Sequence, residues 1–284
     1  MIKYMSKMDN NINNYQLLDC GDKLKLEKFG SVILQRPCTQ AIWRRKNLDI
    51  WKNNQPDGIF LREKSELGNW TWSKSKIQSH KFIQNNLTWE IEPNNFGNLG
   101  IFVEHWNYGS QLLELFQKDK QVLNLFSYSG SSILQLAKNN YKITSVDSSK
   151  SSFELYTRNF ENNLIERQGH RLILEDCYKF VAREIRRNAK YSSILVDCPS
   201  YGRGTKGELF KIEDDISKLL YNLRELLDKD GALFLTLHSP RFTPKILEIF
   251  VQSIFIDKKV EVSEILVDAL SGTQLPSGLL VKIY

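Results

Sequence analysis

The stretch from Val122 to Asp147 constrains the fold more than any other part of the chain. It begins with an apolar strand at 122–126, passes through a turn that contains Gly130, and continues with a helix and a second strand that ends in Asp147. This order predicts a βαβ nucleotide-binding unit, in which the turn approaches the ligand and the terminal carboxylate accepts from a ribose diol. A crossover with a purely structural role has the same features, so this unit alone leaves both interpretations open.

The turn itself narrows the class of ligand. Two glycines of the Gly-x-Gly-x-x-Gly pattern are missing around Gly130, and no Gly-Lys-Ser/Thr follows. These glycines let a pyrophosphate approach the backbone, and the lysine motif holds a triphosphate. We therefore expect a nucleoside without phosphates.

The same alternation continues downstream. Apolar strands at 171–174 and 193–196 both end in acidic residues. In an open parallel sheet, ligands bind outside the carboxyl ends of the strands, so we expect the polar side chains at these ends to converge on one rim. They are Asn124, Asp147, Asp176 and Asp197.

In order and spacing, these motifs resemble those of class I S-adenosylmethionine (SAM)-dependent methyltransferases, and most of all bacterial members related to the 23S ribosomal RNA methyltransferases. The resemblance is carried by the turn at Gly130, the acids Asp147 and Asp176, and the segment 197–204, Asp-Cys-Pro-Ser-Tyr-Gly-Arg-Gly. It implies an α/β fold with a Rossmann-like sheet, which the last segments, 259–267 and 279–284, would close as a hairpin that includes an antiparallel seventh strand.

The resemblance also implies a SAM pocket. Asp147 would accept from both ribose hydroxyls and Asp176 from the adenine amine, with the backbone of Cys177 beside the ring. The remaining candidates would approach the methionine portion or line the floor. They are Ser127, Tyr128, Ser129 and Gly130 near methionine, and Asn124 and Phe126 on the floor. Ser148 is a further candidate contact, although a role as cap of the following helix explains it equally well.

The reaction site is expected at Asp197, Pro199 and Ser200. In related enzymes that act on nitrogens, a motif of this kind positions the target beside the methyl group, because proline fixes the backbone carbonyls that accept from the amine. Cys198 stands where the family usually has proline. It is either a nucleophile for 5-methylcytosine chemistry or a small buried substitute, and we expect the second because residues 235–240 contain no second cysteine.

A glycine-rich basic loop follows this motif. Tyr201 would stack on a flipped base, and Arg203 and Lys206 would contact phosphates. The alternative is a mobile connector, in which Thr205 and Glu208 form a capping box for a helix over 209–227.

A further motif, Gly100-Ile101-Phe102-Val103-Glu104-His105, lies near the start of the same region. It resembles the family's Gly-x-Phe-x-acid-Gln pattern, which approaches the methionine moiety, except that His105 replaces Gln. A lone exposed histidine is usually no ligand, so we expect neither ligand binding nor base catalysis from His105.

Three regions are expected: a disordered tail at 1–14, a small β-rich subdomain at 15–95, and a SAM-binding domain at 96–284. Residues 1–89 contain 15 lysines and arginines against 8 aspartates and glutamates, and five of the six tryptophans. Cations interleaved with aromatic rings suit RNA. Tryptophans of a small β unit are equally expected in its core.

Composition limits the location and the partners. The 284 residues contain no apolar run long enough for a membrane span and no signal peptide, and the four cysteines are scattered without metal-ligand spacing. We therefore expect a cytoplasmic enzyme with no metal and no membrane partner, whose oligomeric state the sequence does not indicate. The expected activity is methylation of a base in ribosomal RNA, on nitrogen rather than carbon. The alternatives are methylation of a protein or small molecule, and a non-catalytic RNA-binding protein that retains SAM.

Overall fold

The computed structural model describes residues 14–63, 67–118, 120–203 and 209–284, and the side chains of 201–210 are not described. The chain divides into two compact units. The first comprises residues 1–99 with 268–273, and the second comprises 100–267 with 274–284. The expected tail at 1–14 lies almost wholly outside the described residues.

The first unit is rich in β-structure. Five strands form one sheet in the order β1-β2-β3-β4-β5, and β6 and β7 form a separate pair. The two-residue turn between β6 and β7 is made by Asn85 and Asn86, both with positive φ, as a tight hairpin requires. The elements are β1 Tyr15–Gly21, β2 Leu24–Phe29, β3 Val32–Pro37, α1 Leu48–Asn53, β4 Gly58–Arg62, β5 Gly68–Trp72, β6 His80–Gln84 and β7 Leu87–Ile91.

The tryptophans of this unit serve mainly packing. Trp51 and Trp89 are buried. The indole N–H of Trp51 donates to Asp19, and that of Trp43 donates to the Cys20 carbonyl. Trp70 donates to the Asn94 carbonyl and stacks on Trp72. Of the two interpretations of these residues, the structure favours the core, because the ring N–H groups of Trp43, Trp51 and Trp70 already have partners inside the unit.

The second unit is built around a seven-stranded sheet in the order β10-β9-β8-β11-β14-β16-β15. The first five strands of this order run parallel, and β16 is antiparallel to β14, so the expected antiparallel strand is confirmed. The strands are β8 Gln121–Leu125, β9 Lys142–Asp147, β10 His170–Leu174, β11 Tyr191–Cys198, β14 Leu227–Leu237, β15 Val260–Asp268 and β16 Gln274–Ile283.

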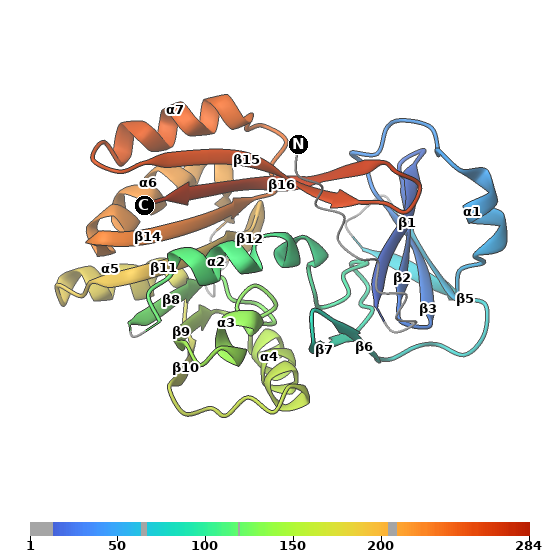
Figure 1. Ribbon diagram of the computed structural model, residues 1–284, viewed down its shortest axis with the longest axis horizontal. Coiled ribbons are helices and arrows are strands. Elements are labelled where there is room, and N and C mark those ends of the chain that lie inside the picture. The colour runs from blue at the N-terminus through green and yellow to red at the C-terminus, as the bar shows by residue number, and fades with distance from the viewer. Residues whose placement is uncertain (1–13, 64–66, 119, 204–208) are drawn as a thin grey trace. The chain divides into compact units, whose positions relative to one another are not determined.

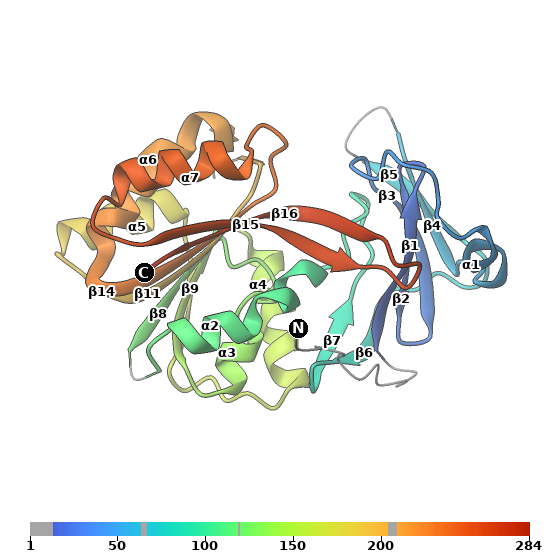
Figure 2. The same ribbon diagram turned by 45° about the horizontal axis from the view of Figure 1, so that its top comes forward.

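Helices cover both faces of this sheet, as Figures 1 and 2 show: α5, α6 and α7 lie on one face, and α2, α3 and α4 on the other. The elements are η1 Val103–Asn107, α2 Gly109–Leu115, α3 Leu134–Lys138, α4 Lys150–Asn162, α5 Cys177–Arg186, α6 Ile212–Leu226 and α7 Pro244–Ile254, with the short strands β12 Tyr201–Arg203 and β13 Leu209–Lys211. The predicted α/β, Rossmann-like class is therefore confirmed.

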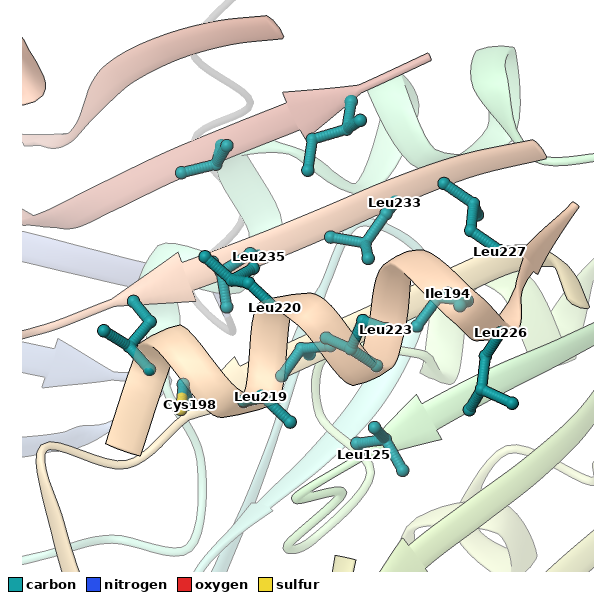
Figure 3. Close-up of a cluster of buried hydrophobic side chains, with 14 of the residues drawn as sticks. Leu125, Ile194, Cys198, Leu219, Leu220, Leu223, Leu226, Leu227, Leu233 and Leu235 are labelled. Atoms are coloured by element: carbon teal, nitrogen blue, oxygen red, sulfur yellow. The ribbon is translucent and has the colours of Figure 1, made fainter. Parts of the chain in front are cut away.

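The largest core cluster lies between the sheet and α6. Leu219, Leu220, Leu223 and Leu226 recur at helical spacing, each is fully buried, and they belong to one cluster with residues of β11 and β14 such as Ile194 and Leu235 (Figure 3). Burying a leucine side chain stabilises a fold by about 1.5–3 kcal/mol relative to exposure. This apolar face therefore anchors α6 directly behind the segment that follows β11.

Two local predictions are wrong in their boundaries. The helix expected over 209–227 begins at Ile212, because 209–211 pair with 201–203 as the hairpin β12-β13. The N-cap position of this helix is Lys211, and the capping-box residues Thr205 and Glu208 lie outside the described residues. The helix expected directly after the Gly130 turn begins only at Leu134, because the loop first makes a further turn, in which the Ile133 N–H donates to the Gly130 carbonyl.

The last residue of β15, Asp268, and the connection 269–273 to β16 belong to the first unit. Within that unit, the Leu270 N–H donates to the Leu17 carbonyl at 2.8 Å, and Ala269 forms a β-bridge with Leu17. The chain thus leaves the second unit, adds a short segment to the first, and returns. None of the helices among the described residues has the length and apolarity needed to cross a membrane.

Candidate active site

The strand order changes direction between β8 and β11. From β8 the chain proceeds outward to β9 and β10, and from β11 it proceeds to β14 on the other side. Ligands of open α/β sheets bind outside the carboxyl ends of the strands at such a switch point. The loop after β8 and the segment after β11 therefore flank the expected pocket.

The loop after β8 is held in an unusual backbone conformation. Phe126, Tyr128 and Gly130 all have positive φ, at 55°, 44° and 73°. Residues other than glycine rarely adopt a positive φ, and residues with such strained backbone concentrate at ligand sites. The hydroxyl oxygens of Ser127 and Ser129 are buried and have no hydrogen-bond partner among the described residues. A polar ligand beside this loop fits these unpaired groups, as the methionine portion of SAM would require.

Gly130 is required by its surroundings. A Cβ placed there would lie 2.6 Å from the ring of Tyr156, which is fully buried under the loop. Any side chain at this position would thus meet both a left-handed backbone and a fixed aromatic ring.

Asp147 ends β9 and is fixed by two backbone amides. Its Oδ2 accepts from the Tyr128 N–H at 2.9 Å, and its Oδ1 accepts from the Ser149 N–H at 2.8 Å. Burial raises the pKa of Asp147, although the donating amides act in the opposite direction. Each oxygen keeps a second lone pair, so the pinned carboxylate can still accept from two hydroxyls of a diol.

Asp176 and Cys177 lie beyond the end of β10. Asp176 is the N-cap of α5, and its Oδ1 accepts from the Lys179 N–H, so the carboxylate is oriented by the helix. The buried Cys177 thiol accepts from the Phe126 N–H at 3.2 Å and thereby supports the loop after β8. Ser148 is exposed and does not cap α4, because Ser149 occupies the N-cap position.

Asn124 does not reach the rim. Its side chain is fully buried within β8 and donates to the Ser145 hydroxyl at 3.3 Å. The register pairs Asn124 with Ser145, two positions before Asp147, so Asn124 lies below the strand ends rather than at them. Of the four polar residues expected at the rim, Asp147, Asp176 and Asp197 lie at or just beyond the ends of β9, β10 and β11, and Phe126 follows directly after β8.

Asp197 faces polar side chains from two other segments, the end of β14 and η1. Thr236 Oγ1 donates to its Oδ1 at 2.5 Å, and His238 Nε2 lies 3.5 Å from the same oxygen. His105 Nε2 lies 3.0 Å from Oδ2. Burial alone would raise the pKa of Asp197, but the charges and hydrogen bonds of His105 and His238 lower it far below the ordinary value. Asp197 is therefore a permanent anion at neutral pH.

The expectation that His105 is exposed is wrong. Its exposed fraction is only 4%, and its second ring nitrogen, Nδ1, lies 3.0 Å from the Ser131 hydroxyl. Sequence reasoning overlooked His238 as well. The available signal was its place directly after β14, where strand-end residues of this sheet gather at the rim.

The residues that follow Asp197 differ in burial. Cys198 is 1% exposed and packs against α6 (Figure 3), and burial raises the pKa of its thiol well above the ordinary value. Pro199 and Ser200 are half-buried, and the Ser200 carbonyl accepts from the Ile212 N–H at the start of α6. The backbones of Tyr201 and Arg203 lie in β12, their side chains are not described, and Lys206 lies outside the described residues.

The contacts of His238 predict a pH-dependent stability. Burial alone would lower the pKa of His238, but Asp197 and Glu104 raise it from 6.5 to about 9. A pKa raised on folding stabilises the protein fully below pH 6.5, and this stabilisation is lost as pH rises to about 9. The free energy of unfolding of the wild type, minus that of His238→Gln, should fall over this range by on the order of 2 kcal/mol. Denaturant titrations at several pH values measure it, and a constant difference would contradict the proposed pairing.

Comparisons with known proteins identify the family of this chain. A family model described as S-adenosylmethionine-dependent methyltransferase matches residues 49–255. The crystal structure of a SAM-dependent methyltransferase from Agrobacterium tumefaciens is similar, with 28% sequence identity, a TM-score of 0.85, and coverage of 95% of this chain and 90% of that one.

Two curated relatives are similar over part of their length. The ribosomal RNA large subunit methyltransferase K of Neisseria meningitidis is 25% identical, over 75% of this chain and 62% of that protein. The ribosomal RNA large subunit methyltransferase K/L of Buchnera aphidicola is 24% identical, over 73% of this chain and 29% of that protein. The chain thus spans less than two thirds of the length of either. Since the family model covers more than half of the chain, this protein belongs to the family of S-adenosylmethionine-dependent methyltransferases.

Proposed function

We propose that this protein transfers a methyl group from SAM to a base of ribosomal RNA, at a nitrogen atom. The observation that carries the proposal is the position of Asp197 beside the sheet's switch point, across from a strained loop and the diol-binding candidate Asp147. The names of the curated relatives from Neisseria and Buchnera support ribosomal RNA as the substrate.

When held by Asp147 and the loop after β8, SAM would supply an electrophilic methyl group to a nitrogen lone pair of the target base, and the proton that this nitrogen loses would pass to solvent. The protein's part is orientation. Asp197 would accept a hydrogen bond from the target N–H and so aim the lone pair, helped by the backbone that Pro199 constrains. With its pKa held far below neutral, Asp197 is a fixed acceptor and not a proton-accepting base.

The burial of the Cys198 thiol favours methylation at a nitrogen atom over methylation at a carbon atom. Methylation at cytosine C5 needs a thiolate that adds to the ring. Cys198 is buried in the core with a raised pKa, and the segment after β14 presents His238 instead of a cysteine. Burial in an apolar core makes Cys198 inert, as expected of a packing residue.

Positively charged side chains would bind the RNA. Several lysines and arginines of the first unit are exposed, and neutralising phosphates would give binding its affinity. They are Lys23, Arg44, Arg62, Lys74, Lys76 and Lys81. Tyr201, Arg203 and Lys206 stay candidates for contacts with the target nucleotide. The tryptophans, whose rings are used in packing, are not needed for this role.

Removing the Asp147 carboxylate should weaken SAM binding. Asp147→Ala deletes a charge-assisted pair to the ribose and the acceptor that holds Tyr128. The expected loss is about 1.5–3 kcal/mol, or roughly 10- to 150-fold in Kd. Calorimetry with SAM measures it. Asp230→Ala, which removes an exposed acid from the opposite end of β14, should leave Kd unchanged, and an Asp147→Ala affinity within twofold of wild type would remove Asp147 from the cofactor site.

The activity itself is tested with labelled SAM. The wild-type protein is incubated with ribosomal RNA from a strain that lacks the gene, and the nucleosides are analysed by mass spectrometry. We expect one N-methylated base, and RNA binding that weakens steeply as salt rises. Label in protein or small molecules would support another methyltransferase substrate, and SAM binding without any transfer would indicate a non-catalytic module.

A further inference from the structure

The buried histidine at position 105 joins two parts of the proposed site that are distant in sequence. Its Nε2 lies 3.0 Å from Asp197 Oδ2 on β11. Its Nδ1 lies 3.0 Å from Ser131 Oγ, which directly follows Gly130 in the loop after β8. The Nε2 contact is an ion-pair distance without hydrogen-bond alignment, whereas Nδ1 is within hydrogen-bond distance of the Ser131 hydroxyl. One ring nitrogen thus faces the proposed reaction site and the other faces the proposed cofactor loop.

The imidazole cannot easily change its position. Phe102 and Tyr108 pack against it, with ring centroids 5.4 Å and 5.7 Å away. Ser131 is buried as well, with an exposed fraction of 6%. Because water has little access to either contact, loss of the histidine would leave buried polar groups without partners.

We propose that His105 is a positioning residue that couples the conformation of the loop after β8 to the orientation of the Asp197 carboxylate. The proposal rests on the function proposed above, since it assigns the loop to SAM and Asp197 to the target base. Coupling is reciprocal: a ligand that orders the loop favours one orientation of Asp197, and an oriented Asp197 favours the ordered loop.

The coupling leads to distinct expectations for variants of His105 and of Ser131. His105→Ala should lower kcat by roughly 10- to 100-fold, because a shift of about 1 Å in an orienting group can cost that much. Ser131→Ala should lower kcat by a smaller factor. In the His105→Ala/Ser131→Ala double variant it should add little, since the link from Ser131 through His105 to Asp197 is already broken. His105→Gln should recover most of the activity, because the amide offers both a donor and an acceptor.

A spectroscopic measurement tests the coupling without turnover. In protein labelled at aspartate carboxyl carbons, SAM binding should shift the Asp197 signal in the wild type and in His105→Gln. The shift should be lost in Ser131→Ala and His105→Ala, although both still bind SAM. His170→Ala is the matched control, since His170 is a partly buried histidine that packs on Phe160 and touches no residue of the site.

The outcomes separate the two proposals. A SAM-induced shift of Asp197 that depends on Ser131 and His105, without methylation of RNA, would uphold the coupling and refute the proposed substrate. A shift that persists in both Ser131→Ala and His105→Gln/Ser131→Ala would overturn the coupling. So would losses in kcat that multiply in the double variant. If His105→Ala does not fold, Ser131→Ala and His105→Gln decide the question.

Discussion

Replacing Asp197 with alanine should reduce methyl transfer on the order of 10³-fold, while the Kd for SAM changes by less than about threefold. The large loss follows from the role of the carboxylate as a fixed acceptor, whose interaction with the target is used mainly in the transition state. SAM affinity should largely survive, because the groups proposed to hold the cofactor lie on the loop after β8 and at Asp147. Single-turnover kinetics and calorimetry measure the two quantities.

Controls separate chemistry from folding in this experiment. Asp197→Ala leaves His105 and His238 without the anion that they face, so some stability is lost as well. Asp197→Asn keeps the shape and one acceptor oxygen and should retain more activity than Asp197→Ala. Asp230→Ala removes the same charge far from the rim and should behave like the wild type. An equal loss of SAM affinity and turnover in Asp197→Ala would instead assign Asp197 to the cofactor site.

Gly130→Ala should destabilise the protein by about 2–4 kcal/mol and weaken SAM binding at least about tenfold. Two effects combine at this position. The left-handed backbone disfavours a side chain, and the added Cβ would lie 2.6 Å from the buried Tyr156 ring, which has no room to retreat. The loop that bears Ser127 and Ser129 would have to shift. Thermal unfolding and calorimetry measure both effects.

Gly169 offers a matched control for the backbone effect alone. Its φ of 87° is also left-handed, but a Cβ there meets only the side chain of Lys142 at 3.4 Å. Gly169→Ala should therefore cost about 1–2 kcal/mol and leave SAM binding intact. A Gly130→Ala/Tyr156→Leu variant, which removes the ring, should recover part of the lost affinity. Equal behaviour of Gly130→Ala and Gly169→Ala would show that the collision with Tyr156 is unimportant.

The histidines show where sequence reasoning stops. His105 lies in a recognisable motif and His238 follows an apolar strand, but neither position indicates that both side chains meet Asp197. A strand or helix pattern reports which face of an element is apolar, and it carries no information on which polar residues from distant segments become neighbours. The same reason explains why the buried position of Asn124 was not predicted. Asn124 pairs with Ser145, two residues before the strand-end Asp147, and this register is a long-range contact.

The sequence by itself determined the α/β class, the order of strands and crossovers around Gly130 and Asp147, and the hairpin at the end of the chain. These follow from apolar periodicity, from one glycine and from strand-end acids, all of which act locally. Only the tertiary structure decided that 268–273 belong to the first unit, that the tryptophans are packed, and that Asp197 lies between two histidines. These features depend on long-range contacts, because burial and charge pairing arise only when separate segments are brought together.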